Sequence, residues 1–323
     1  MYMNILITSA GQRVSLVKSF KKELAAFFGD SKVFTTDLNP QLSPACHVSD
    51  RSFKVPKVTD DEYIRCLLKI CLDNDVKLII PTIDTELKTL SLNIEHFKKY
   101  NIEIIVSDYS LVEICRDKRK VNKLFVEHNI EIPEQFNVDN LVFPVFVKPC
   151  DGSRSEGIFL ASTSKDIKDE HINNKKLMFM EYISNEDYDE FTVDCYYDKH
   201  SDLKCVVPRQ RIAVRAGEVS KGVTKNNFIV SEFQKHLSKL EGAKGCLTIQ
   251  VFLHKKLNRI KGIEINPRFG GGYPLTYLSG ANYTRWLIEE YMLNKRIEKF
   301  NGWQDNLLML RYDAEVLVED HNE

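Results

Sequence analysis

The chain has 323 residues, with 45 Lys and Arg against 46 Asp and Glu. This length suffices for two or three packed units, and the near-neutral charge excludes a global field that would attract nucleic acid or an acidic membrane surface. No apolar run approaches the roughly 20 residues of a membrane span, and the first ten residues lack a signal-peptide pattern, so we expect a cytoplasmic protein with small partners and neither nucleic acid nor membrane as a target.

Apolar strands and amphipathic helices alternate over the first 110 or so residues. Strands are expected at 4–8, 33–36, 78–81 and 102–106, and one helix at about 61–73. Two more helices are expected from their apolar spacing, one with Val17, Phe20, Leu24 and Phe27 and one with Leu87, Leu90, Ile94 and Phe97. Such alternation predicts a small open parallel sheet with helices on both faces. Ligands of these sheets gather at the carboxyl ends of strands, which makes Asp84 and Glu86 candidate substrate residues. Both residues equally suit the cap of the helix that follows them.

The first glycine turn does not carry a dinucleotide fingerprint. That fingerprint needs three spaced glycines, and only Gly11 is present here. A nicotinamide or flavin site is therefore disfavoured. Asp37, at the end of the second strand, is interpreted as a turn residue in preference to a ribose ligand.

A second pattern begins after residue 110. A helix is expected to begin near Lys118, and a buried strand at 143–149 contains Lys148 just before a glycine and serine loop, 151–157. Backbone N–H groups and hydroxyls of such a loop suit phosphate oxygens, and Lys148 adds a positive charge. The loop is not a P-loop, because no Gly-Lys-Ser precedes a helix. Two more strands are expected at 177–183 and 190–197.

Near the C-terminus, Glu264, Asn266 and Arg268 alternate along a short strand that three glycines follow. Because strand side chains alternate between faces, these three are expected to point the same way. Carboxylate and amide oxygens suit Mg²⁺ and an arginine suits phosphate, so the triplet predicts a metal-phosphate clamp, with a solvated strand face as the plainer alternative. An antiparallel strand at 248–252 would place Gln250 beside Glu264.

The last segments supply candidate substrate contacts. Arg211 and Arg215 lie in the cationic stretch 208–221, where they could bind a substrate carboxylate or form a solvated strand edge. Gly271, in the glycine run, would let the backbone approach a substrate closely. A long helix over 274–293 and a strand over 307–312 are expected to complete the fold.

The order of these signals resembles the ATP-grasp superfamily, and it is most similar to the single-unit branch related to the carbamoyl-phosphate synthase large subunit. The resemblance spans essentially the whole chain. It implies an α/β pre-ATP-grasp, Rossmann-like parallel-sheet domain at 1–112. An α+β ATP-grasp fold with antiparallel sheets would follow, with a small subdomain and its Gly-rich loop at 113–183 and a large subdomain with the metal site at 184–323.

The resemblance also implies a nucleotide site. Lys118 and Lys148 correspond to lysines that hold the phosphates of ATP. The residues of the covering loop are Gly152, Ser153, Ser155 and Gly157. Those of the hinge, which reads adenine mainly through main chain, are Glu181, Tyr182 and Ile183. Glu190 corresponds to the ribose carboxylate, although the unusually acidic connection leaves Glu186 and Asp187 as alternatives.

The metal and phosphoryl groups complete the implied site. Gln250, Glu264 and Asn266 correspond to ligands of two Mg²⁺ (or Mn²⁺) ions, and the glutamine replaces the acid of many relatives. Arg268 corresponds to the contact with the transferred phosphoryl group, so Arg268, Lys148 and Asn266 form the implied catalytic set.

The implied activity is an ATP-dependent, ADP-forming ligase that joins a small carboxylate to an amine or another nucleophile through an acyl phosphate. An ATP-binding module that supports a protein partner without turnover is the main alternative. A Rossmann oxidoreductase is a third, which the missing glycine fingerprint opposes. A homodimer is left open by the sequence.

Overall fold

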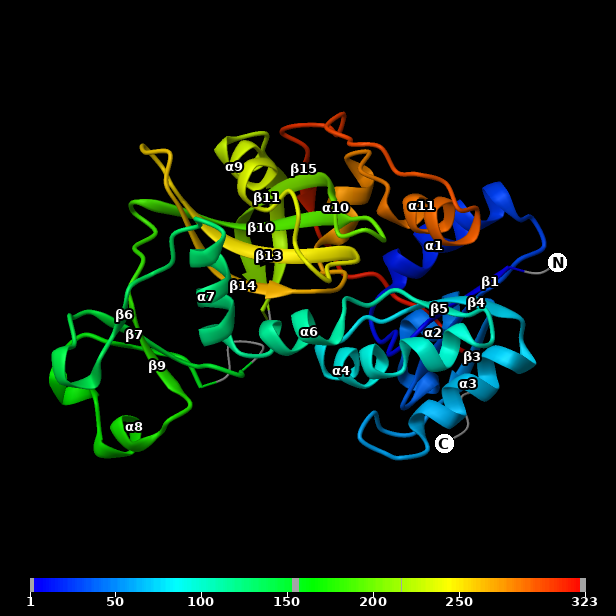
Figure 1. The fold of residues 1–323 in the computed structure, drawn as a ribbon, viewed down its shortest axis with the longest axis horizontal. Helices are drawn as coiled ribbons and strands as arrows, with labels where there is room; N and C mark the ends of the chain where they lie inside the picture. Colours follow the sequence, from blue (N-terminus) through cyan, green and yellow to red (C-terminus); the bar gives the residue numbers. More distant parts are fainter. Residues whose placement is uncertain (1–2, 153–156, 216, 320–323) are drawn as a thin grey trace.

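The computed structural model describes residues 3–152, 157–215 and 217–319. Within these ranges the protein forms a parallel sheet A, followed along the chain by antiparallel sheets C and B (Figure 1). None of the helices in these ranges combines the length and the apolar character that crossing a membrane requires. The expected succession of a parallel-sheet domain and antiparallel sheets is confirmed.

Sheet A has the strand order β3-β2-β1-β4-β5. Its strands are β1 (Asn4–Ile7), β2 (Val33–Asp37), β3 (Arg51–Lys54), β4 (Val76–Ile80) and β5 (Glu103–Ile104). The helices of this region are α1 (Val14–Phe27), α2 (Pro44–Val48), α3 (Tyr63–Asp73), α4 (Asp84–Leu92) and α5 (Ile94–Lys98).

The two faces of sheet A bury different helices, as strand alternation requires. Ile5 packs in one core with Phe20 of α1, whereas Leu6 packs in a second core with Leu67 of α3. Two details differ from expectation. The single helix expected to carry Leu87, Leu90, Ile94 and Phe97 is interrupted at Asn93. Strand β3 was not predicted, because its side chains are exposed or only half-buried.

Sheet C is a small antiparallel sheet in the order β6-β9-β7-β8. Two helices, α6 (Tyr109–Cys115) and α7 (Lys118–Glu127), lead into it. Its elements are β6 (Gln135–Phe136), β7 (Val145–Pro149), β8 (Phe159–Ala161), α8 (Asp169–Asn173) and β9 (Leu177–Glu181). It has its own core around Val145, Val147 and Phe179.

Sheet B is the largest sheet, in the order β14-β13-β10-β11-β12-β15. Its strands are β10 (Tyr188–Tyr197), β11 (Leu203–Arg215), β12 (Glu218–Thr224), β13 (Gly245–His254), β14 (Ile260–Asn266) and β15 (Leu308–Leu310). The helices of this region are α9 (Phe228–His236), α10 (Tyr273–Leu278), α11 (Tyr283–Leu287) and the π-helix η4 (Ile288–Met292). The prediction of one long helix over 274–293 is wrong. Gly280 adopts a left-handed φ of +102°, and this backbone conformation ends α10.

Helix α7 packs against β14 through a glycine (Figure 1). A Cβ atom at Gly262 would lie 2.6 Å from ring atoms of Phe125, so only glycine lets the helix approach this closely. The helix begins at Lys118, whose backbone N–H donates to the carbonyl of Cys150 at 2.8 Å. The start of α7 is thereby held next to the end of β7.

Sheet A also packs on the region of sheet B, mainly through α1 (Figure 1). Phe20 meets the ring of Phe269 edge to face at 6.1 Å, and Tyr277 donates a hydrogen bond to Glu23 at 2.8 Å. This packing directs the carboxyl ends of the sheet A strands toward the end of β14. The domain boundaries expected at 112 and 183 stay predictions.

Candidate active site

A carboxylate and two amides converge where β13 and β14 pair. Asn266 Nδ2 donates to Glu264 Oε1 at 3.0 Å, so the two side chains lie together on one face of β14. Gln250 is the register partner of Glu264. With its amide oriented to give both atoms complementary partners, the Gln250 nitrogen lies 2.5 Å from Glu264 Oε1. The expected pairing of strands thus brings three oxygen-bearing side chains to one place.

Two lysines approach this group from the side of sheet C. Lys148, on β7, is buried, and burial together with the charge of Lys118 lowers the pKa of its ammonium to about 8, while Glu264 opposes the shift. Lys118 Nζ donates to the carbonyl of Gly152 at 2.6 Å, at the start of the glycine and serine loop. Ser153 and Ser155 lie outside the described residues, which resume at Gly157 with a left-handed φ of +69°.

Arg211 and Glu190 form the other wall of the cluster. Arg211 Nε lies 3.1 Å from Glu190 Oε1, and Arg211 Nη1 donates to Thr192 Oγ1 at 3.2 Å. In the orientation given above, the Gln250 oxygen lies 2.8 Å from Arg211 Nη1. Burial raises the pKa of the Glu190 carboxyl, Arg211 opposes the shift and Glu264 adds to it. Arg211, expected near the substrate, therefore lies beside the expected metal ligands.

The donor set fits a divalent cation at Glu264 and Asn266. The described residues contain no group of three His, Cys, Asp or Glu side chains that could hold a metal ion. Glu264 and the amide oxygen of Asn266 instead offer the hard oxygen donors that Mg²⁺ prefers, and the Gln250 oxygen would join them only by leaving its contact with Arg211. The part of the site next to Gln250 carries less net negative charge than the part next to Glu264, because the positive guanidinium of Arg211 contacts the Gln250 amide.

The segment after β9 leaves main-chain groups available. The Glu181 carboxylate is committed to protein contacts, since it accepts from Lys261 Nζ at 2.6 Å and from the N–H of Glu134 at 3.0 Å. Within the described parts of the chain, the main-chain N–H and C=O groups of Tyr182 and Ile183 have no hydrogen-bond partner. Glu186 and Asp187 are exposed on the turn before β10, whereas Glu190 lies in the cluster.

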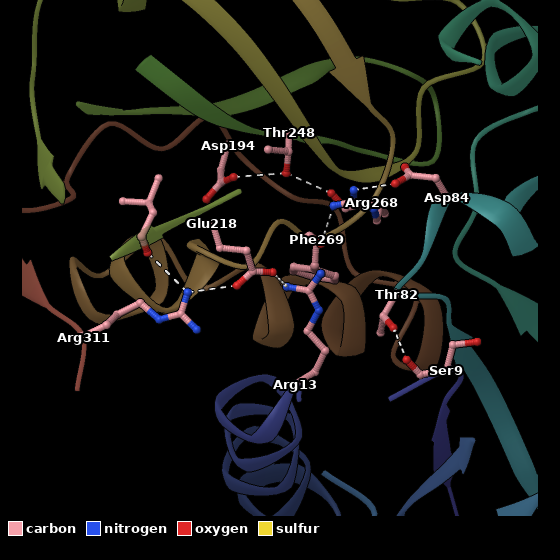
Figure 2. A network of polar contacts seen from close by, with 11 residues as sticks. Ser9, Arg13, Thr82, Asp84, Asp194, Glu218, Thr248, Arg268, Phe269 and Arg311 are labelled. Carbon is pink, nitrogen blue, oxygen red and sulfur yellow. Dashed lines mark hydrogen bonds and ion pairs between the residues drawn. The ribbon is translucent and has the colours of Figure 1, made fainter. Parts of the chain in front are cut away.

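Arg268 lies at the contact between sheets A and B. Strand β14 ends at Asn266, so the side-chain alternation expected to align Arg268 with Glu264 does not reach it. Arg268 Nη2 donates instead to Asp84 Oδ2 at 2.5 Å, and Thr248 Oγ1 donates to the Arg268 carbonyl at 2.9 Å (Figure 2). Asp84, at the start of α4, therefore faces the candidate site, as the strand-end rule predicted.

Glu86 is not a substrate residue. Its side chain is fully buried and accepts from the N–H groups of Thr82 and Ile83 at 2.8 and 3.2 Å, and from the hydroxyls of Ser9 and Tyr63. Burial raises the pKa of this carboxyl. The prediction of a substrate contact is wrong because the carboxylate is used at the N-terminus of α4, as the alternative interpretation had it.

Two other candidates are occupied by protein contacts. Arg215 has a side chain 66% exposed and donates to Asp313 Oδ2 at 3.0 Å, away from the cluster of Glu264. A Cβ atom at Gly271 would lie 2.3 Å from the Glu218 carboxylate. The glycine therefore makes room for Glu218, so the close approach expected there is made by a protein side chain.

Arg13, Glu218 and Arg311 form a charged group that the sequence did not reveal as a set (Figure 2). Arg13 Nη1 lies 3.6 Å from Glu218 Oε1, and Arg311 Nη1 donates to Glu218 Oε2 at 2.9 Å. Burial lowers the pKa of the Arg13 guanidinium. The strand-end rule draws attention to the region of Arg13, but no local pattern marks Glu218 or Arg311.

A parallel-sheet domain, a small sheet bearing a lysine and a glycine loop, and a large sheet bearing Glu264 and Asn266 together define the ATP-grasp fold. The chain has the ATP-grasp fold, and a model of an ATP-grasp family matches part of its sequence. Residues 5–105 match the family model described as PylC-like, N-terminal domain. Residues 173–310 match the model described as ATP-grasp in the biosynthetic pathway with Ter operon. No curated protein matches the sequence.

Solved structures share the fold at low sequence identity. The biotin carboxylase domain of 2-oxoglutarate carboxylase from Hydrogenobacter thermophilus superposes with a TM-score of 0.71 at 12% identity, over 95% of this chain and 73% of that one. N5-carboxyaminoimidazole ribonucleotide synthetase from Thermotoga maritima gives 0.64 at 20% identity, over 95% and 79%. The L-amino acid ligase from Bacillus licheniformis gives 0.64 at 16%, over 90% and 74%. The finer likeness to carbamoyl-phosphate synthase stays a prediction.

Proposed function

We propose that the protein is an ATP-dependent, ADP-forming ligase that joins a small carboxylate to an amine or another nucleophile. The observation that carries this proposal is the convergence of Glu264, Asn266 and Gln250 with the buried Lys148. The similar structures include an L-amino acid ligase and a synthetase, and the biotin carboxylase domain was solved with MgADP and bicarbonate. These names support ATP and Mg²⁺ as ligands of the present chain.

The reaction needs an activated acid because a carboxylate has no good leaving group. A substrate carboxylate oxygen attacks the γ-phosphorus of ATP while the bond to the β,γ-bridging oxygen breaks, which gives an acyl phosphate and ADP. The amine then attacks the acyl carbon and phosphate leaves, while the proton lost from nitrogen passes to phosphate or water. Lys148 and Lys118 neutralise charge on the phosphate oxygens and help to align the two reactants.

Glu264 and Asn266, with Gln250, are the residues that would hold Mg²⁺ or Mn²⁺. When bound, the ion supplies further neutralisation of the β- and γ-phosphate charge. Arg268 would contact the transferred group either through its unpartnered Nε or, after its hydrogen bond to Asp84 opens, through Nη2.

The nucleotide base and ribose are assigned to the segment between sheets C and B. The main chain of 181–183 would contact adenine, and Glu190 is the preferred ribose ligand over Glu186 and Asp187. The loop between Gly152 and Gly157 would cover the phosphates and keep water from the acyl phosphate. Use of ATP accords with the cytoplasmic location expected from the sequence.

The direct test is product release. The purified protein is incubated with Mg-ATP and a panel of carboxylic acids, each with and without amines, and ADP and phosphate are measured. Acid-dependent release of both supports the ligase. Tight ATP binding without turnover on any acid and amine pair would favour a nucleotide-binding module instead.

A matched pair of variants links that activity to the site. Glu264→Gln is expected to abolish turnover while circular dichroism shows an intact fold. Glu95→Gln, which alters a side chain that is 82% exposed on α5, should behave as the wild type. Unchanged turnover in Glu264→Gln would refute the assignment of Glu264.

A further inference from the structure

Arg13 is a desolvated cation without a hydrogen bond. It follows the turn at Gly11, at the carboxyl end of β1, and its guanidinium extends toward sheet B (Figure 2). Its side chain is 20% exposed, and Glu218, its ion-pair partner, lies at 3.6 Å, beyond hydrogen-bond distance. Among the described residues no acceptor takes any of its N–H groups. A guanidinium offers five such donors, and those of Arg13 are not among the buried unpartnered atoms, so they remain accessible to a ligand.

The charges around Arg13 do not balance. Arg13, Arg268 and Arg311 provide three positive charges, and Asp84 and Glu218 provide two negative charges that influence the same guanidinium. Asp84 is used by Arg268 and Glu218 by Arg311, both through hydrogen bonds. One positive charge, that of Arg13, is therefore left without an acceptor at hydrogen-bond distance.

This group adjoins the proposed reaction site. Arg268 is two residues beyond Asn266, and Glu218 lies directly over Gly271 in the same turn. Arg13 comes from the opposite domain and faces this turn across the contact between the sheets (Figure 2). A small acid whose reacting carboxylate lies near Lys148 and Glu264 would extend its other end toward Arg13.

We propose that the acid substrate carries a second anionic group, either a carboxylate or a phosphate, and that Arg13 binds it with help from Arg311. The inference rests on the proposed ligase function and narrows its substrate class to dianionic acids. An acceptor with two oxygens matches the planar fork of a guanidinium and supplies the missing negative charge.

The test measures binding of matched ligands, so it does not depend on turnover. Succinate, glutarate, adipate and L-glutamate are titrated by calorimetry against their half-amides, including L-glutamine, and 4-phosphonobutyrate tests the phosphate arm. At least one dianion should bind about tenfold or more tightly than its half-amide, as expected for a charge-assisted bidentate contact. Preference for the phosphonate over glutarate would identify a phosphate, and the reverse a carboxylate.

Variants then assign the preference to Arg13. Arg13→Gln should remove the discrimination between dianion and half-amide, Arg13→Lys should keep part of it, and Arg311→Gln should weaken it. Arg65→Gln, at a side chain 82% exposed on α3, is the matched control and should bind as the wild type. Equal binding of every dianion and its half-amide, failure of every dianion to bind, or full discrimination in Arg13→Gln would overturn the proposal.

The two proposals fail differently. If acids with one anionic group support ADP release equally well in the wild type and in Arg13→Gln, the ligase stands and the dianion inference falls. If dianions bind through Arg13 but no acid supports ADP release, the anion site stands and the ligase falls.

Discussion

Replacing Lys148 by methionine should stabilise the empty protein while removing its affinity for ATP. The pKa of this buried ammonium is lowered from 10.5 to about 8, with burial as the largest cause. Each pKa unit corresponds to about 1.36 kcal/mol, so keeping the charged lysine in the fold costs about 3 kcal/mol at neutral pH. With an unfolding entropy of roughly 2 cal/mol/K per residue, this predicts a rise in Tm of about 4 °C for Lys148→Met.

The pH dependence of this gain has a definite sign. Below pH 8 the lysine is charged in both folded and unfolded chains, and the full cost is present. Between pH 8 and 10.5 the unfolded chain binds more protons than the folded one, so the stability of the wild type rises with pH. The advantage of Lys148→Met should therefore shrink to below about 1 kcal/mol at pH 10.

Thermal unfolding at pH 7 and pH 10, with ATP binding measured in parallel, checks the prediction. Lys118→Met is the matched control, because Lys118 Nζ already donates to the Gly152 carbonyl. That variant should lose ATP affinity and gain less stability than Lys148→Met, because removing the charge of Lys118 relieves only the smaller of the two causes that lower the pKa of Lys148. A Lys148→Met protein that melts at or below the wild-type temperature at pH 7, or whose advantage does not depend on pH, would refute the reasoning.

Two further predictions concern the scaffold. Gly262→Ala forces a methyl group to within 2.6 Å of the Phe125 ring, so we expect the free energy of unfolding to fall by about 1–3 kcal/mol. Displacement of α7 should also weaken ATP binding, and Phe125→Leu should restore part of the stability. Melting at the wild-type temperature would contradict that packing. Asp194→Asn leaves the Arg209 guanidinium, 1% exposed and bidentate to Asp194, without its counter-charge, and should cost about 3–5 kcal/mol in urea unfolding. An unchanged urea midpoint would argue against a structural role for this ion pair.

The sequence was most informative where one local rule determined the geometry. Strand alternation places Glu264 and Asn266 on one face, and an antiparallel neighbour places Gln250 opposite, as the register shows. The apolar periodicity of α1 likewise predicted that Val17, Phe20 and Leu24 pack in the core beside sheet A, whereas Leu72, placed on the apolar stripe of α3, is exposed. These features depend on residues close in sequence or on a single hairpin, so periodicity is enough to predict them.

Prediction failed where distant segments decide the outcome. Asp84 and Arg268 are 184 positions apart, and no local pattern shows that they form a hydrogen bond. Glu86 had two consistent interpretations, and burial beneath Tyr63 selected the structural one. The helix expected over 274–293 was inferred from scattered apolar positions such as Leu278 and Trp286, but the backbone of Gly280 ends the first helix of this segment.

In the empty site, the Asp84 carboxylate neutralises the positive charge of Arg268 through their hydrogen bond. Any phosphate or carboxylate that engages the same edge of Arg268 must first displace Asp84, so a stray inorganic anion gains little net free energy there. A substrate held additionally at other points can afford the exchange. The Asp84 carboxylate at the start of α4 thus lowers the affinity of Arg268 for ligands that contact the site at this one point only.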